Sequence, residues 1–107
     1  MTAPDTALAL VLTTLGAQTD AAAIARVLVE ERLAACVNVL PVMTSVYRWK
    51  GVVEEDREQQ LVIKTTRDRV AALETRLRAL HPYELPEFVV LDARASAAYA
   101  AWVGESV

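Results

Sequence analysis

The segment ACVNVLPVMTSVYRW, residues 35–49, decides the fold, because it is rich in the β-branched and aromatic residues that favour a strand. Lys50-Gly51 then predicts a turn, and the chain returns through VVEEDREQQLVIKTT. A strand over residues 36–49 would span ~46 Å, which exceeds the diameter of roughly 34 Å expected for so small a domain. We therefore expect the hairpin to bend at Pro41, which cannot donate to a ladder, or to project onto neighbouring subunits. The alternative is two shorter strands with an irregular connection.

The chain before this hairpin predicts one strand and one helix. Residues 7–12, ALALVL, form an apolar run whose length is typical of a strand buried on both faces. Thr19-Asp20 offers an N-cap for a helix that continues to about residue 32.

The chain after the hairpin repeats this pattern. Residues 65–68, TTRD, have the spacing of a capping box before a helix that ends at His81-Pro82. Residues 87–91 predict the last strand, and Ser96 can cap a short helix with Tyr99, Trp102 and Val103 on one face. The order strand, helix, strand, strand, helix, strand predicts an α+β, ferredoxin-like sandwich with two helices on one face of a mainly antiparallel sheet.

Composition limits the class of protein. The 107 residues predict a single domain over 1–107, and 54% hydrophobic residues with 3 Gly and 4 Pro exclude disordered and collagenous chains. A net charge of −3 argues against a nucleic-acid partner, and the run 7–12 is too short to span a membrane. One cysteine fits a reducing compartment, so we expect a cytoplasmic protein. The apolar excess predicts that copies of the chain associate.

Five segments together resemble the divalent-cation tolerance protein CutA family: LAACVNVLP (33–41), TSVYRWKG (44–51), IKTT (63–66), HPYELPE (81–87) and Tyr99-x-x-Trp102. The resemblance implies a ferredoxin-like subunit, a homotrimer built through the long hairpins and a trimer similar to PII signalling proteins. It also implies a role in tolerance of copper and other divalent metals. Some members carry a second cysteine where this chain has Thr13, and a hydroxyl is a poor ligand for soft Cu(I).

His81, Glu84 and Glu87 are the candidate metal ligands, because an imidazole and two carboxylates lie within one short polar loop. A second interpretation of His81 is a helix cap that favours the helix dipole when protonated. One histidine and one cysteine cannot build a closed four-ligand site within one chain. We therefore expect no required cofactor, with copper or another divalent cation as a candidate ligand.

A cleft between subunits is the second candidate site. If the hairpin projects, Tyr47, Arg48 and Trp49 cannot all pack on their own subunit, so they would cover a neighbour's loop at Tyr83. Lys64 would line the same cleft and meet an anion or Glu87, or else would extend its ammonium into solvent.

Other chemistry-bearing residues predict structural roles. Cys36 in an apolar strand and Trp102 in the tail helix are expected in the core, as a small buried side chain and a packing anchor. The acidic run of Glu54, Glu55, Asp56 and Glu58 predicts a solvated face, because it lacks the spacing of a calcium loop.

Three functions are compatible with these observations. The first is a non-catalytic homotrimer that binds a divalent metal ion or a small ligand between subunits. The second is a PII-like regulatory trimer that binds a small anion. The third is an acylphosphatase-like hydrolase, which needs a Gly-rich anion cradle and a positioned Arg. The loop LGAQT, residues 15–19, has one Gly and no Arg, which argues against the hydrolase.

Overall fold

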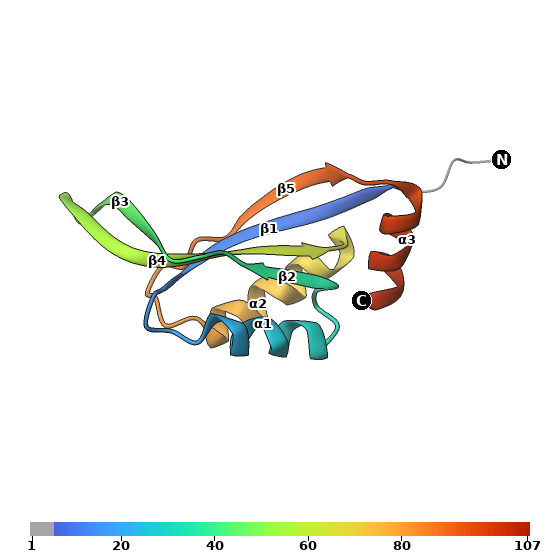
Figure 1. Ribbon diagram of the computed structural model, residues 1–107, viewed down its shortest axis with the longest axis horizontal. Coiled ribbons are helices and arrows are strands. Elements are labelled where there is room, and N and C mark those ends of the chain that lie inside the picture. The colour runs from blue at the N-terminus through green and yellow to red at the C-terminus, as the bar shows by residue number, and fades with distance from the viewer. Residues whose placement is uncertain (1–5) are drawn as a thin grey trace.

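The computed structural model describes residues 6–107 as one antiparallel sheet with α1 and α2 on one face and α3 across one end (Figure 1). The elements in chain order are β1 (Ala7–Gly16), α1 (Ala21–Glu30), β2 (Cys36–Val39), β3 (Met43–Trp49), β4 (Val52–Thr65), the 3-10 turn η1 (Arg67–Arg69), α2 (Val70–Leu80), β5 (Val89–Arg94) and α3 (Ala97–Ser106). None of the helices described here is long and apolar enough to cross a membrane. Residues 1–5 of the predicted single domain lie outside the described part.

The sheet has the strand order β2-β4-β1-β5, and β3 pairs separately with β4. Every pairing is antiparallel, including that of β1 with β4 from Ala9↔Thr65 to Gly16↔Glu58. This arrangement confirms the predicted ferredoxin-like sandwich. It also places the end of β1 beside the middle of β4, where the projecting hairpin begins.

The main core lies between the sheet and helices α1 and α2. It contains the buried residues Val11, Leu15, Ala21, Leu28, Leu33, Ala34, Leu61, Ile63, Leu73 and Leu77. Leu10 and Leu12, which alternate with Val11 along β1, are only half-buried. The prediction that residues 7–12 would be buried on both faces is therefore wrong for the single chain, because α1 and α2 cover only one face of the sheet.

The long hairpin projects from the body of the molecule (Figure 1). The molecule measures 55 × 24 × 24 Å, and β3 with the first half of β4 extends along the long axis. Pro41 lies in the break between β2 and β3, as its missing N–H predicts. Lys50 and Gly51 make the turn with φ of 50° and 82°, and a positive φ is easiest for glycine. The expectation of a projecting hairpin and the alternative of two shorter strands each hold in part. The strand is broken between β2 and β3, and the hairpin still projects.

Two predicted helix caps are confirmed. The Asp20 carboxylate accepts from the N–H of Ala23 at 3.1 Å, and the Ser96 hydroxyl accepts from that of Tyr99 at 3.2 Å. Each residue satisfies one of the donors that a helix start leaves unpaired.

The predicted capping box at residues 65–68 is wrong. Thr65 is buried, and its hydroxyl donates to the carbonyl of Leu33 at 2.8 Å. The Thr66 hydroxyl bonds the Asp68 carboxylate instead, and the chain makes η1 before α2 begins at Val70. The last strand, predicted at 87–91, begins two residues later and extends to Arg94.

Candidate functional site

The loop between α2 and β5, residues 81–88, is fixed to the sheet by a buried histidine. His81 is 7% exposed, and its Nδ1 accepts the N–H of Tyr83 at 3.1 Å. Its Nε2 lies 2.7 Å from the carbonyl oxygen of Thr14. Because Nδ1 accepts, Nε2 must carry the proton and donate to that carbonyl. Both ring nitrogens of His81 are therefore engaged within the chain.

A buried carboxylate anchors the same loop. The Tyr83 hydroxyl donates to Glu58 Oε2 at 2.7 Å, and Glu58 is only 6% exposed. Burial and then this hydrogen bond raise the pKa of Tyr83, because both disfavour the phenolate. Gly16 lies opposite Glu58 in the register, and a Cβ there would lie 3.5 Å from Tyr83 Oη. The prediction that the acidic run is solvated is wrong for Glu58, although its other members are exposed.

A second phenol–carboxylate pair lies further along the hairpin. Tyr47 on β3 donates to Asp56 on β4, and this hydrogen bond is the main cause that raises the pKa of Tyr47 to about 12. At the turn, Lys50 Nζ lies 3.7 Å from Glu84 Oε2. The loop 81–88 is therefore joined to the hairpin at two points, at its base through Tyr83 and at its turn through Glu84. These contacts hold the predicted cleft residues Tyr47 and Tyr83 on the same end of the molecule.

Arg48 and Trp49, the other two hairpin residues predicted for the cleft, have local contacts. Arg48 Nη1 donates to the carbonyl of Gly51 at 3.2 Å, and Lys50 Nζ lies 5.5 Å from the centroid of the Trp49 ring. Arg48 is exposed and Trp49 is half-buried. Both side chains lie at the projecting end, and the described residues of one chain form no cleft around them.

The three predicted metal ligands do not converge. The ring nitrogens of His81 are occupied, and the Glu84 side chain is 74% exposed and pairs with Lys50. Glu87 has a buried Oε2 with no hydrogen-bond partner among the described residues. Within residues 6–107 there is no group of three or more His, Cys, Asp or Glu side chains placed to hold a metal ion. The donors that the described part of one chain supplies therefore do not fit a metal site.

Thr13 lies on the sheet face that α1 and α2 cover. It is fully buried, and its Oγ1 has no hydrogen-bond partner in the described part of the chain. The side chain at this position therefore faces the interior of the subunit rather than a neighbour.

Lys64 lies at the opposite end of β4 from the hairpin. It stands opposite Cys36 on β2 and Leu10 on β1, whereas Tyr47 stands opposite Glu54. The ten residue-to-residue steps along β4 from Glu54 to Lys64 correspond to ~33 Å. One chain therefore does not bring Lys64 into the cleft predicted around Tyr47 and Tyr83.

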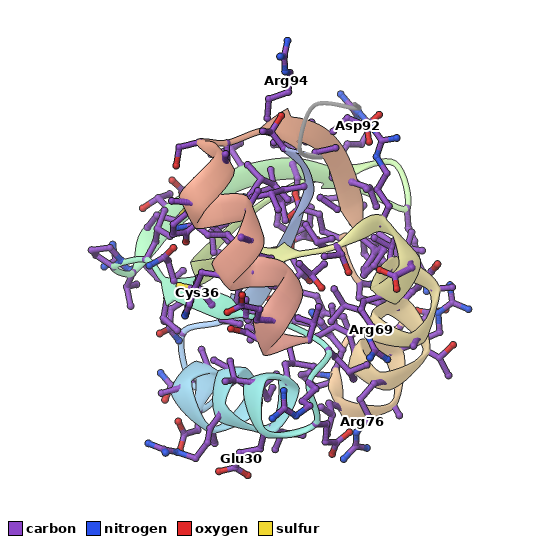
Figure 2. All side chains as sticks on the ribbon, turned by 90° about the vertical axis from the view of Figure 1, so that its right-hand side faces the viewer. Glu30, Cys36, Arg69, Arg76, Asp92 and Arg94 are labelled. Carbon is purple, nitrogen blue, oxygen red and sulfur yellow. The ribbon has the colours of Figure 1, made fainter. Side chains whose placement is uncertain are left out.

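The prediction that Cys36 and Trp102 lie in the core is wrong for the single chain. Cys36 is half-buried on the uncovered sheet face, with Sγ 4.0 Å from Asn38 Oδ1. Figure 2 looks onto the end of the sheet that α3 crosses, and Cys36 is labelled there. Trp102 is 44% exposed, because α3 turns Ala100 and Val103 inward instead. The sequence pattern wrongly grouped Val103 with the two aromatic residues.

Sequence reasoning missed two contributors to these sites. Glu58 is the buried partner of Tyr83, and Tyr99 places its ring centroid 5.8 Å from Lys64 Nζ. No local pattern marks Glu58, because its burial depends on a loop that follows 25 residues later. The tail-helix position of Tyr99 was a signal, but the sequence did not place α3 against the end of β4.

Residues 9–106 match the model of the family described as CutA1 divalent ion tolerance protein. The "Divalent-cation tolerance protein CutA" of Thermus thermophilus is 48% identical over 97 residues, which cover 90% of this chain and 94% of that protein.

Solved structures agree with this match. The divalent cation tolerance protein Cut A1 from Thermus thermophilus has a TM-score of 0.89 and 46% identity, covering 94% of this chain and 98% of that chain. The PII-like protein CutA from Nostoc sp. PCC 7120 in apo form has a TM-score of 0.84 and 39% identity, covering 92% and 97%. The family model, the sequence relative and the shared fold agree over nearly the whole chain. The chain belongs to the CutA1 divalent ion tolerance protein family.

Proposed function

We propose that this chain forms a homotrimer that contributes to divalent metal ion tolerance, copper included, by binding rather than by catalysis. In this proposal a metal ion or a small ligand is held in clefts between subunits. Membership of the CutA1 family over residues 9–106 supports the tolerance role. We further propose a cytoplasmic location, which the single cysteine favours.

The projecting hairpin is the observation that carries the proposal. Val46, Val52 and Val53 are 65%, 57% and 61% exposed on it. An apolar ribbon with an unpaired edge is prone to uncontrolled pairing unless a partner covers it. A second copy of the chain is a suitable partner, because it supplies an uncovered sheet face that the first copy also needs to bury.

That complementary surface lies on β5 and the adjoining face of the sheet. Val89 and Leu91 are 42% and 45% exposed, and Leu10 and Leu12 on β1 are half-buried beside them. A contact between two different patches repeats from copy to copy, and it closes into a ring when the rotation fits. The family resemblance favours three copies in that ring.

A metal ion would need donors from more than one chain. Glu87 is the best candidate among the predicted ligands, because its buried Oε2 lacks a donor among the described residues of its own subunit. Glu84 is accessible but pairs with Lys50, and His81 would have to break a hydrogen bond before it could bind a metal. The carboxylates favour a hard or borderline divalent ion over Cu(I).

Regulation by a small anion, as in a PII-like trimer, is the second candidate function. Lys64 favours it, because this half-buried residue has no carboxylate partner among the described ion pairs. The hydrolase alternative rests on fold analogy alone.

Two measurements test the proposal. Light scattering on dilute protein should give a mass near three times 11.7 kDa, and a stable monomer would contradict the assembly. Calorimetric titration of Cu²⁺ and Zn²⁺ into protein free of metal and purification tag tests the ion. Glu87→Gln should weaken binding more than Glu84→Gln, which removes an already paired and exposed carboxylate. Unchanged affinity in a trimeric Glu87→Gln variant would remove Glu87 from the site.

A further inference from the structure

Strand β2 ends the sheet on one side, and no described strand pairs with its outer edge. The N–H of Leu40, just after β2, donates to the carbonyl of Gln60 on β4 at 2.9 Å. N–H groups alternate in direction along an antiparallel strand, so those of Val37 and Val39 point toward the open edge. Unpaired backbone groups at the edge of a sheet favour pairing with another strand.

A groove lies beside this open edge, between β2 and α1. It has a volume of about 300 Å³ and is lined by Ala22, Ala25, Arg26, Val29, Glu30 and Val37. Four of these residues are apolar, and the other two carry opposite charges one turn apart on α1. Arg26 and Glu30 are exposed and take part in none of the ion pairs found within residues 6–107. The groove therefore combines an apolar surface with a cation and an anion that lack partners.

Strand β5 ends the sheet on the other side, and its outer edge is also open among the described strands. The N–H of Ala95, just after β5, donates to the carbonyl of Thr6 at 3.0 Å. The same alternation points the N–H groups of Val90, Asp92 and Arg94 toward the open edge. Their exposed side chains lie on the sheet face of α1 and α2, because Val90 stands opposite a buried core residue of β1.

The charges of this row are accessible to a second chain. Figure 2 shows the side chains of Asp92 and Arg94 at the β5 edge and that of Glu30 on α1 at the other side of the molecule. Arg94 takes part in none of the ion pairs between described residues. Asp92 lies 3.2 Å from Arg67, but the two side chains are 74% and 63% exposed, so this ion pair contributes little.

The direction and spacing of the two rows agree. Rotation about an axis along the strands preserves strand direction, so β5 of the next copy would run antiparallel to β2 and in the same direction as α1 (Figure 1). Two residues along a strand, as from Asp92 to Arg94, span ~6.6 Å. Four residues along a helix, as from Arg26 to Glu30, span ~6 Å. An acid and then a base on β5 therefore face a base and then an acid on α1.

We propose that β5 of a second copy adds to the open edge of β2. Asp92 of that copy pairs with Arg26 on α1. Arg94 of that copy pairs with Glu30, and its Val90 fills the apolar part of the groove. The hairpin contact proposed above uses the opposite face of β5, so both contacts can form in one assembly. This inference rests on the proposed homotrimer and names the residues that set its strand register.

A charge-reversal cycle tests the pair whose two residues have no ion pair within their own chain. Glu30→Arg and Arg94→Glu should each weaken association about tenfold or more, because like charges then meet across the interface. The double variant exchanges the two charges and should recover most of the lost affinity. Light scattering on dilution measures association, in stepped guanidinium concentrations if the trimer does not dissociate in buffer. Glu105→Arg is the matched control, since it reverses an exposed helix carboxylate outside the groove and should leave association unchanged.

Hydrogen exchange measures the added strand directly and uses the wild-type protein. The N–H groups of Val37 and Val39 have no partner strand within the described chain. They should exchange slowly in the assembled protein and about tenfold or more faster after dissociation, because strand addition supplies their acceptors.

Two results would overturn the inference and leave the trimer intact. One is a charge cycle without coupling, in which Glu30→Arg weakens association no more than Glu105→Arg or the double variant recovers nothing. The other is fast exchange of Val37 and Val39 in the assembled wild type, which would assign the groove to a partner other than this strand. A monomeric wild type would instead overturn the proposed homotrimer and this inference with it.

Discussion

The two halves of β4 differ in what covers them. From Leu61 to Thr65 alternate side chains are buried, and Leu61 and Ile63 are 0% exposed against α1 and α2. From Val52 to Arg57 every residue is exposed, although the backbone pairs with β3 throughout. The same secondary structure is therefore stabilised by a packed core in one half and has no packed core against it in the other half. Glu58, at the junction, is buried by Tyr83.

Leu61→Ala tests the buried half and should have the largest effect. The side chain is fully buried in the main core, so its loss should lower the free energy of unfolding by about 2–5 kcal/mol. Chemical denaturation at fixed protein concentration measures this change. A loss below about 1 kcal/mol would mean that the core collapses around the deleted side chain and that the two halves differ less than their exposure indicates.

Tyr83→Phe tests the junction. It leaves the buried Glu58 carboxylate without its phenol donor, which should cost about 1–3 kcal/mol. Tyr47→Phe is the matched control, because it breaks a similar pair at 40% exposure, where water replaces the lost partner. Thermal unfolding of both variants gives the comparison. Equal losses of stability in the two variants would show that the burial of Glu58 does not increase the cost of losing its phenol donor.

The two phenols should also make stability fall at high pH. The pKa of Tyr83 is raised by burial and by Glu58, and that of Tyr47 is raised to about 12 by its hydrogen bond to Asp56. An unfolded tyrosine ionises near pH 10, so this contribution is present below about pH 10. It is lost as pH rises through the folded pKa, because the unfolded state then binds fewer protons.

Ultraviolet absorbance of phenolate checks this pH prediction directly. The wild type should show late-titrating phenols, and Tyr47→Phe and Tyr83→Phe should each remove one of them. If all phenols ionise together near pH 10, the two hydrogen bonds do not persist in solution.

Val53→Ala tests the exposed half and should have the smallest effect on folding. The side chain is 61% exposed, so the unfolding of a subunit should change by at most about 0.5 kcal/mol. The same change should weaken association if the hairpin docks on a neighbour, which dilution followed by light scattering measures. A large loss of subunit stability with unchanged association would reverse the assignment of this half to an interface.

Local chemistry could be predicted from the sequence where the cause lies within a few residues. Asp20 and Ser96 cap their helices as expected, and Pro41 interrupts the strand. Prediction failed where a residue far away in the chain competes for the same hydrogen-bonding group. Thr65 has the spacing of a helix cap, but its hydroxyl is taken by the carbonyl of Leu33, 32 residues earlier.

The candidate site shows the same limit. His81 and Tyr83 could be grouped from sequence because only one residue separates them, and the structure links them directly. Lys64 could not be placed, since its contact with Tyr99 depends on how α3 crosses the end of the sheet.

Periodicity, backbone preference and motif spacing were enough to predict the order of elements, the hairpin turn at Lys50-Gly51 and the family. The folded arrangement was needed to show that Glu58 is buried, that His81 uses both ring nitrogens and that Lys64 has no counter-ion within residues 6–107. The reason is physical: burial and charge pairing are properties of the space around a side chain, and segments far apart in the chain enclose that space.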